Sequence, residues 1–382
     1  MAQMKVITLG AGLVGTPMVL DLAKNGEFEV TVVDINQTSL AKLDGISNLK
    51  TIHMDLSDRE AVKGIVKGYD LVLSAVPGFM GYQTLKAIIE AGKNVVDISF
   101  FPEDLFDLDH LAKEKKVVAI ADIGVAPGMS NVLIGYAHGQ LDKTTKAVIY
   151  VGGLPRKREW PYEYKAVFSP VDVIEEYTRP ARYMENGFLV TRPALSDPEL
   201  INFPVIGTLE AFNSDGLRSL AKTIDCPNMI EKTLRYKGHI EIMAILRETG
   251  FFDKNPIEIN GAMISPLDFT SKILFPKWKL RENEEDITVM QVIIEGEKDG
   301  RKLRYIYHLF DSYDPQTRVH SMARSTGYTA TMAVRMVAKG MYSRNGISAP
   351  EFIGQDKTCV DFILNGLAER GVIYQETIER LD

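Results

Sequence analysis

The sequence predicts an α/β protein, a Rossmann-type doubly wound parallel sheet with an inserted α+β second domain. Short β-rich apolar runs alternate with longer amphipathic segments in the first third of the chain, and neighbouring parallel strands need such crossover connections. A glycine-rich turn follows the first of these runs. With 382 residues, the chain is longer than one hydrophobic core usually organises, which favours two domains.

The first domain is expected over residues 1–125. It contains six runs with the apolar, β-branched composition of buried strands, separated by segments of helical periodicity. The runs lie at 5–9, 30–33, 51–54, 71–75, 94–97 and 117–121. Repeats of this kind predict one parallel sheet, the layout of a nucleotide-binding domain.

The second domain is expected over residues 126–319, where strands with scattered helices replace the βα repeats. A strand at 148–151 is predicted to end at Gly152-Gly153-Leu154-Pro155. Ser169-Pro170 is typical of a helix start, and Asp299-Gly300 predicts the turn of a hairpin. The other elements predicted here are a helix through 177, a strand into 235–236, a helix at 239–248 and paired strands at 289–295 and 301–309.

Residues 320–382 are expected to return to the first domain. Helical periodicity predicts helices at 322–339 and 357–370. Gly340 and Gly371 follow directly, where glycine commonly ends a helix. The second domain is therefore interpreted as an insertion.

Composition and charge exclude several classes of protein. The net charge of −7 argues against nucleic acid as a partner. Two cysteines, Cys226 and Cys359, are too few for a disulfide framework or a Cys-rich zinc site, and the histidines lack metal-ligand spacing, so no metal is expected. No run of about 18 apolar residues predicts a membrane span, and no signal peptide is visible. A cytoplasmic enzyme is the expectation.

The glycine turn is the strongest motif for cofactor binding. It reads Gly10-Ala11-Gly12-Leu13-Val14-Gly15 between a predicted strand and a predicted helix. In such a turn the first glycine permits the tight bend, the second lets the backbone approach a pyrophosphate, and the third allows close helix–strand packing. The helix N-terminus favours the anion. A dinucleotide site is predicted here.

The ends of later strands complete this predicted site. Asp34 ends the second strand at the spacing of the residue that accepts hydrogen bonds from the adenosine ribose, and its charge would repel a 2′-phosphate, which favours NAD over NADP. Asp55 is a candidate for adenine contact, or a solvated loop carboxylate. The small-residue segment Ala75-Val76-Pro77 either leaves room for the ribose and nicotinamide or is an ordinary βα turn.

Four further segments, together with the glycine turn, resemble the saccharopine dehydrogenase-like family over most of the chain. They are 122–129, 150–155, 176–181 and 233–239. The likeness is greatest to the lysine 6-dehydrogenase branch of that family. It implies NAD-dependent oxidation of the ε-amine of L-lysine to allysine, which cyclises to a piperideine carboxylate. A homodimer formed through the second domain is a further expectation.

Two positions separate this branch from the main alternative, the glutamate-forming saccharopine reductases. That branch typically has Asp-Pro-Gly where this chain has Ala126-Pro127-Gly128, and Gly-Phe where it has Gly238-His239. Both departures favour lysine as the substrate. A carboxynorspermidine synthase-like activity belongs to the same superfamily and stays open.

Three residues are candidates for catalysis. His239 is one because imidazole titrates near neutrality and a helix N-terminus would keep it neutral; a hydrogen-bonded structural histidine is the alternative. Asp97 and Asp122 end the fifth and sixth predicted strands, where either would orient a water or the carboxamide, or cap a loop.

Four residues are candidates for binding an amino-acid substrate. Arg218 and Arg235 carry guanidinium groups that match a carboxylate, and a structural ion pair is the alternative for each. Asp215 would receive the α-ammonium or cap a helix. Tyr164 would line the pocket, although core packing is the better interpretation. A rival of another class is a non-catalytic NAD-binding redox sensor.

Overall fold

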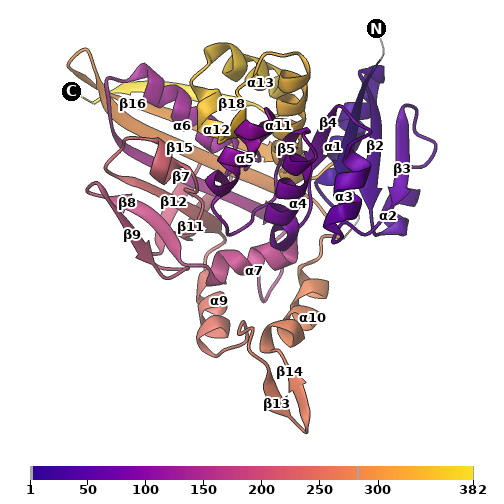
Figure 1. Ribbon diagram of the computed structural model, residues 1–382. Helices are drawn as coiled ribbons and strands as arrows, with labels where there is room; N and C mark the ends of the chain where they lie inside the picture. Colours follow the sequence, from indigo (N-terminus) through magenta and orange to yellow (C-terminus); the bar gives the residue numbers. More distant parts are fainter. Residues whose placement is uncertain (1–2, 282–283, 382) are drawn as a thin grey trace. The chain divides into compact units, whose positions relative to one another are not determined.

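The computed structural model describes residues 3–281 and 284–381, which form two compact units. The first unit comprises Met1–Gln140 and Ala323–Tyr374. The second comprises Leu141–Met322 and Gln375–Asp382. The chain therefore builds most of the first unit, then the second, and returns to the first (Figure 1).

The first unit is built on a seven-stranded sheet in which every pairing is parallel. The strand order is β17-β6-β5-β4-β1-β2-β3. All four residues of β4 are buried, and because successive side chains point to opposite faces, both faces of the sheet are covered. The predicted Rossmann-type fold is confirmed. The strands are β1 (Met4–Leu9), β2 (Phe28–Asp34), β3 (Leu49–His53), β4 (Leu71–Ser74), β5 (Asn94–Asp97), β6 (Val118–Ile120) and β17 (Gly346–Ser348).

Helices connect these strands, as the six predicted βα repeats require. Several begin with an aspartate or asparagine whose side chain accepts hydrogen bonds from the first turn, as Asp58 does for α3 and Asn36 for α2. The helices of this unit are α1 (Gly15–Ala23), α2 (Gln37–Ala41), α3 (Arg59–Val66), α4 (Gly78–Glu90), α5 (Asp109–Glu114), α6 (Met129–Gln140), α12 (Pro350–Gly354) and α13 (Lys357–Glu369), most of α11 (Ser321–Ala338), and the short 3-10 helices η1 (Lys24–Gly26) and η2 (Leu105–Leu108).

The boundaries of the first unit differ from the sequence-based ones at two places. The unit continues past residue 125 through α6, because α6 packs closely on α12: a Cβ at Gly135 would overlap the backbone of Glu351. The return segment ends at Tyr374, because the next strand joins the other sheet. The two predicted C-terminal helices are present as α11 and α13.

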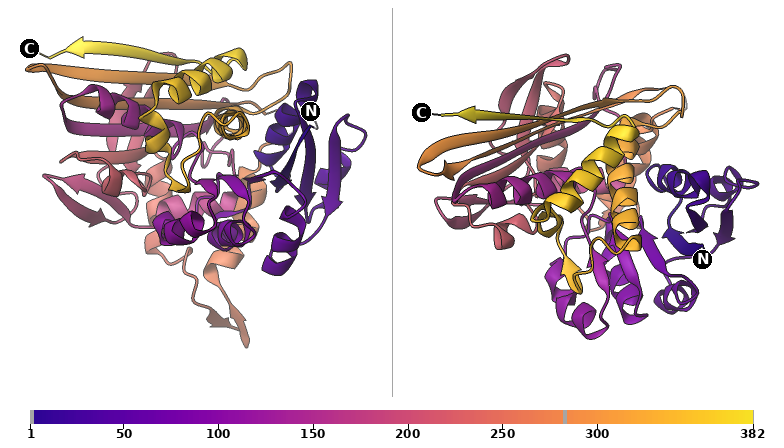
Figure 2. Two further views of the ribbon diagram at one scale, coloured as in Figure 1. Left: turned by 45° about the horizontal axis from the view of Figure 1, so that its top comes forward. Right: turned by 90° about the horizontal axis from the view of Figure 1, so that it is seen from above.

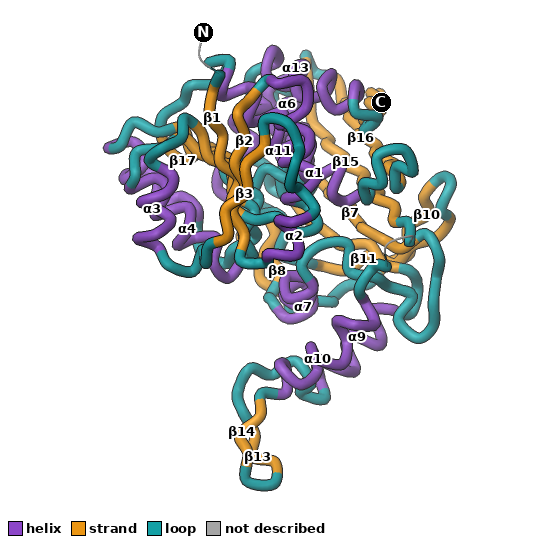
Figure 3. The backbone as a smooth tube through the Cα atoms, turned by 90° about the vertical axis from the view of Figure 1, so that its right-hand side faces the viewer, coloured by secondary structure: helices purple, strands orange, loops and turns teal. Residues whose placement is uncertain are grey.

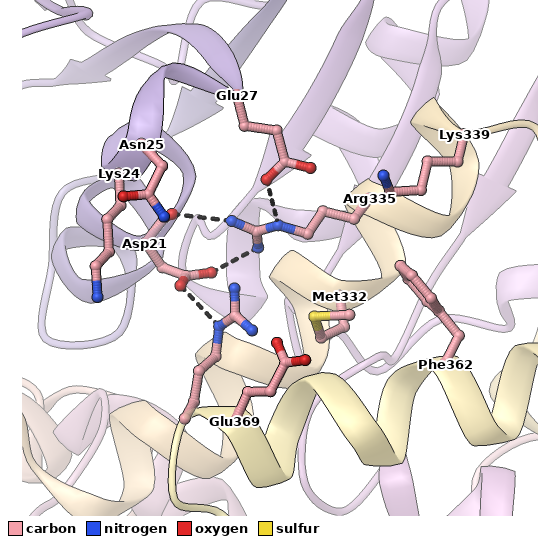
Figure 4. Close-up of a pocket in the computed structure, with 10 residues that line it drawn as sticks. Asp21, Lys24, Asn25, Glu27, Met332, Arg335, Lys339, Phe362 and Glu369 are labelled. Atoms are coloured by element: carbon pink, nitrogen blue, oxygen red, sulfur yellow. Dashed lines mark hydrogen bonds and ion pairs between the residues drawn. The ribbon is translucent and has the colours of Figure 1, made fainter.

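A network of charged residues ties the returning helices to α1. The Asp21 carboxylate accepts hydrogen bonds from Arg335 of α11 at 2.6 Å and from Arg370, just after α13, at 2.7 Å. Thr331 donates a third at 2.6 Å, and Glu27 pairs with Arg335 at 2.7 Å. Figure 4 shows Asp21, Glu27 and Arg335 converging in a polar pocket.

The second unit is built on a nine-stranded mixed sheet. Its main path runs β10-β11-β12-β7-β15-β16-β18, with β8 beside β12 and β9 beside β8. Figure 2 shows β18 in yellow alongside the orange β16. The strands are β7 (Lys143–Pro155), β8 (Ala181–Glu185), β9 (Phe188–Arg192), β10 (Glu199–Phe203), β11 (Gly207–Asn213), β12 (Met229–Arg235), β15 (Asp286–Lys298), β16 (Arg301–Ser312) and β18 (Tyr374–Arg380).

One strand prediction in this unit is wrong. The segment Gly152-Gly153-Leu154-Pro155 does not end the strand, because β7 continues through it and pairs with β15 as far as Pro155. Gly152 is needed for packing, because a Cβ at this position would lie 2.7 Å from the Cβ of Leu234 in β12. The predicted hairpin is present as β15 and β16, with Asp299 and Gly300 at φ of 50° and 71°.

The remaining elements of the second unit form helices and a small hairpin. Its helices are α7 (Pro170–Thr178), α8 (Leu220–Thr223), α9 (His239–Glu248) and α10 (Pro266–Trp278). A two-stranded sheet of β13 (Ile257–Ile259) and β14 (Ala262–Ile264) lies between α9 and α10 in the chain. No helix within the described ranges is long and apolar enough to span a membrane.

Candidate active site

The glycine turn joins β1 to α1 and is packed tightly at its first and third glycines. Gly10 has φ of 107°, and a Cβ there would lie 2.7 Å from the carbonyl oxygen of Ala75. A Cβ at Gly15 would overlap the carbonyl oxygen of Gly10. At Gly12, by contrast, an added Cβ would meet no described atom within 4 Å. The second glycine therefore faces open space, as the backbone that approaches a pyrophosphate must.

The start of α1 is suited to the same anion. Val14 precedes the helix, and in the described structure no side chain caps the first turn. The first amide N–H groups of a helix lack partners within it, and the helix dipole favours negative charge there. Leu13 is half-exposed on the turn. The observed geometry thus fits a dinucleotide.

Asp34 lies against the turn from the end of β2. Its carboxylate accepts hydrogen bonds from the Ala11 amide at 2.6 Å and the Asn36 amide at 2.7 Å. It is partly exposed, so it retains lone pairs for a ribose hydroxyl. Asp55, after β3, is exposed and accepts the Ser57 amide at 2.9 Å, which is the loop-capping arrangement.

The segment after β4 borders the turn directly. Ala75 donates its amide to the carbonyl of Leu9 at 2.8 Å and forms the wall against which Gly10 packs. Val76 is buried, and Pro77 precedes α4. This segment therefore lies at the carboxyl ends of the strands, where ligands of doubly wound sheets bind.

Two buried carboxyl groups lie at the same edge of the sheet: Asp97 is the last residue of β5, and Asp122 follows β6. Asp97 accepts the Ser99 amide at 2.7 Å and the Ser99 hydroxyl at 3.2 Å. Burial raises the pKa of Asp97 to about 7, and the nearby charge of Asp122 acts in the same direction. A carboxyl that titrates near neutrality at a ligand-binding edge is a candidate acid/base group.

In the second unit, Arg235 is the centre of a buried polar cluster. Its guanidinium pairs with Glu176 at 2.5 Å, donates to the Tyr177 hydroxyl at 3.1 Å and lies over the ring of Tyr164, 4.6 Å from its centroid. Arg235 thus has an internal carboxylate partner, the arrangement that the sequence left open as an alternative to a substrate clamp.

His239 and Tyr164 belong to the same cluster. The His239 ring is bonded through Nδ1 to the carbonyl of Tyr162 and through Nε2 to the hydroxyl of Tyr177, each at 2.9 Å. Burial lowers the pKa of His239 to about 3, and the charge of Arg235 adds to this effect. The imidazole is therefore neutral, with both nitrogens engaged. Tyr164 is buried between His239 and Trp278, in a core-packing position.

A second polar group in this unit surrounds Glu231. Its carboxyl accepts hydrogen bonds from the Ser214 hydroxyl at 2.7 Å and the Gly216 amide at 3.0 Å, and burial raises its pKa to about 8. Asp215 is held by Arg182 through bonds of 2.9 and 2.8 Å, rather than capping a helix. Arg218 lies in the same loop, partly buried, at φ of 52°.

Sequence reasoning missed Glu231, Glu176 and Tyr177 as parts of these groups. A signal for the first was present: positions 231, 233 and 235 all carry polar side chains on one face of β12, the face that turns toward α7. Alternating apolar residues would be expected there if the face were an ordinary core.

Comparison with known proteins settles the family. The model of the saccharopine dehydrogenase NADP binding domain matches residues 6–120, and that of the saccharopine dehydrogenase C-terminal domain matches residues 124–372. The chain belongs to the saccharopine dehydrogenase family. It is an oxidoreductase whose first unit is a nicotinamide-dinucleotide-binding domain, and the resemblance drawn from the sequence is confirmed.

Relatives from this family match nearly the full length of the chain. The saccharopine dehydrogenase (NADP(+), L-glutamate-forming) of Schizosaccharomyces pombe is 24% identical over 98% of each chain. Carboxyaminopropylagmatine dehydrogenase of Synechocystis sp. is 25% identical, also over 98% of each chain. The apo saccharopine dehydrogenase (L-Glu forming) from Saccharomyces cerevisiae superposes with a TM-score of 0.80 at 21% identity, covering 98% of this chain and 100% of that one. That likeness supports the fold.

Proposed function

We propose that this member of the saccharopine dehydrogenase family oxidises the ε-amine of L-lysine with NAD. Lysine, NAD and water give the semialdehyde, NADH, ammonium and a proton. The observation that carries the proposal is the pair of buried carboxyls, Asp97 and Asp122, at the ligand-binding edge of the dinucleotide sheet. An amine substrate is a cation until it loses a proton, and a carboxyl with a pKa of about 7 suits its removal.

The chain's own residues divide the remaining tasks. The bound nicotinamide supplies the hydride acceptor. The backbone at Gly12 and the start of α1 hold the pyrophosphate, while Asp34 holds the ribose hydroxyls. Asp97 accepts the proton of the ammonium group and, with Asp122, orients the attacking water.

In the second unit, Arg218 is the proposed partner of the substrate carboxylate, and Asp215 that of the α-ammonium. Arg235 and His239 are proposed as positioning residues. Arg235 already pairs with Glu176, and His239 fixes Tyr177 through a hydrogen bond of 2.9 Å. A neutral His239 adds no charge that would repel a cationic amine.

A second candidate is glutamate-forming saccharopine oxidation, which the name of the Schizosaccharomyces pombe relative favours. Ala126 and His239, the two departures from that branch, favour lysine. Absorbance of the reduced cofactor, followed with lysine, ornithine or saccharopine and with either NAD or NADP, separates the candidates. Turnover of lysine with NAD is expected; turnover of saccharopine without lysine would overturn the substrate assignment.

Replacing Asp34 is expected to change the choice of cofactor. Asp34→Ala removes the charged acceptor proposed for the ribose hydroxyls. A hydrogen bond to a charged group contributes about 1.5–3 kcal/mol, so the loss of one should weaken NAD binding by roughly 10- to 150-fold. Asp34→Asn is the closest control because its one side-chain oxygen can still accept either the Ala11 or the Asn36 amide, yet it lacks the charge. We expect Asp34→Asn to lower the preference for NAD over NADP in fluorescence titrations; an unchanged ratio would refute the role of the charge.

Replacing Asp97 is expected to remove the titration near pH 7. Asp97→Asn should lower kcat/KM by about 10²- to 10⁴-fold, the range for a lost acid/base group. The kcat/KM profile of the wild type should rise through a pKa of about 7, and that of the variant should lack this limb. A profile that keeps the limb in the variant would assign the titration to another group.

Stability supplies the control for this variant. Because burial raises the pKa of Asp97, the folded state holds the proton more tightly, and ionisation costs stability progressively between the ordinary value of 3.8 and about 7. Asp97→Asn removes that cost. In denaturant titrations, the free energy of unfolding of the variant minus that of the wild type should therefore be larger at pH 8 than at pH 5.

A further inference from the structure

The hairpin of β13 and β14 projects from the second unit beyond α9 and α10, as Figures 1 and 3 both show. Asn260 and Gly261 form its turn, with φ of 52° and 83°, the combination of a tight two-residue hairpin turn. It is a separate two-stranded sheet. Such an isolated hairpin is at best marginally stable in water, whereas a sheet of three or more strands with an apolar face can be stable by itself.

The side chains of the hairpin separate into two faces. Ile257 and Ile259 of β13 stand opposite Ile264 and Ala262 of β14, which makes one face entirely apolar. Ile257 is 52% exposed and Ile259 is 44% exposed. A strand pattern that segregates apolar side chains onto one face normally buries that face, yet this chain leaves it in solvent.

The two edges of the hairpin differ in whether they carry features that discourage pairing with a further strand. The β13 edge is preceded by Pro256 and carries Glu258, both devices that discourage strand pairing. The β14 edge, formed by Ala262, Met263 and Ile264, carries neither charge nor proline. The outer strands β9, β10 and β18 of the large sheet all carry charged residues. Among these edge strands, β14 alone has no charge.

Self-pairing is chemically complementary at β14 and not at β13. Antiparallel pairing of a strand with its own copy about a two-fold axis places its central residue opposite itself. At β13 this would oppose Glu258 to Glu258, which is destabilising. At β14 it opposes Met263 to Met263 and Ala262 to Ile264, which are all apolar pairs.

We propose that β14 pairs edge to edge with β14 of a second copy of this chain. The two hairpins then form one four-stranded sheet, in which the apolar faces of both copies are continuous. This inference stands apart from the proposed reaction, since it rests only on the hairpin. An isologous contact of this kind closes as a dimer.

Cross-linking tests the pairing directly. Directly opposed residues in antiparallel strands have Cα atoms about 4.5–5.5 Å apart, within the span of about 4.4–6.8 Å that a disulfide needs. Met263→Cys is therefore expected to form a disulfide-linked dimer under mild oxidation, reversed by reductant. The native Cys226 and Cys359 are buried and should give little background. Met263 is 67% exposed, so the substitution should not disturb folding.

The matched control is Glu258→Cys, since Glu258 is the residue directly opposite Met263 within the same hairpin. It lies on the other edge and should not cross-link. Absence of cross-linking at Met263, or equally rapid cross-linking at Glu258, would overturn the proposal.

A charge-swap experiment tests the same pairing without oxidation. Met263→Lys opposes two cations across the axis, and Met263→Glu opposes two anions, so each should be monomeric by light scattering under conditions where the wild type is a dimer. Mixing the two variants should restore a mixed dimer. A dimer that persists in either variant alone would place the interface elsewhere.

Discussion

Replacing Gly12 with alanine is expected to weaken NADH binding by roughly 5- to 150-fold while leaving the free protein as stable as the wild type. The added Cβ meets no protein atom within 4 Å, so the fold has room for it. The bound pyrophosphate would approach the backbone at this position, and a methyl group there overpacks the contact at a cost of about 1–3 kcal/mol. Fluorescence titration with NADH and thermal unfolding of the free protein measure the two quantities separately.

Two other glycines provide controls for this experiment. A Cβ at Gly15 would overlap the carbonyl oxygen of Gly10, so Gly15→Ala should lose stability as well as binding. Gly64, inside α3, also has open space around it. Gly64→Ala should gain about 0.5–1 kcal/mol in the free energy of unfolding and leave binding unchanged. Wild-type affinity in Gly12→Ala would mean that the pyrophosphate binds elsewhere.

The parallel sheet was predictable because the sequence signals for its strands and its first turn lie within short segments of the chain. Each of its first six strands overlaps one of the short β-rich runs of the sequence, and the glycine turn marks the first crossover. β17 was not predictable, because a strand of three residues, Gly346–Ser348, carries no periodic pattern of its own. It is a strand only because β6 presents an open edge beside it.

The second unit was less predictable because close packing reversed the local signals. Gly152 and Gly153 are typical breakers, yet they lie inside β7, where neighbouring side chains occupy the space that a Cβ would need. The hairpin at Asn260-Gly261 did carry a local signal, since that dipeptide between apolar residues is typical of a two-residue turn.

The candidate site shows the same limit. His239 and Arg235 could be selected by residue type, but their partners could not. Tyr177 lies 62 residues before His239 and 58 before Arg235, so only the fold brings them together. The pKa of Asp97 likewise depends on burial at the end of β5, which a sequence position does not reveal.

The largest loss of stability is expected for Asp21→Asn. Burial disfavours the charged form of Asp21, but the guanidinium groups of Arg335 and Arg370 outweigh this, so its pKa lies below the ordinary value. Removing the charge takes the carboxylate away from Arg370 and leaves the nearly buried guanidinium of Arg335 with Glu27 as its carboxylate partner. Breaking a buried pair costs about 3–5 kcal/mol in the free energy of unfolding. Urea titration at neutral pH measures it.

The surface pair of Lys357 and Asp361 is the matched control, because both side chains are more than half exposed. Asp361→Asn should cost no more than about 0.5 kcal/mol in the free energy of unfolding.

The effect at Asp21 should also depend on pH. A carboxyl whose pKa is lower in the folded than in the unfolded state stabilises the fold at pH values above its ordinary pKa. That stabilisation is lost as the pH falls through the pKa of the folded state. The gap between wild type and Asp21→Asn should therefore be widest near neutrality and narrow in acid. A loss at neutral pH no greater than that of Asp361→Asn would mean that the returning helices are held to α1 by apolar packing, such as that of Gly327 on Met18, and not by this charge network.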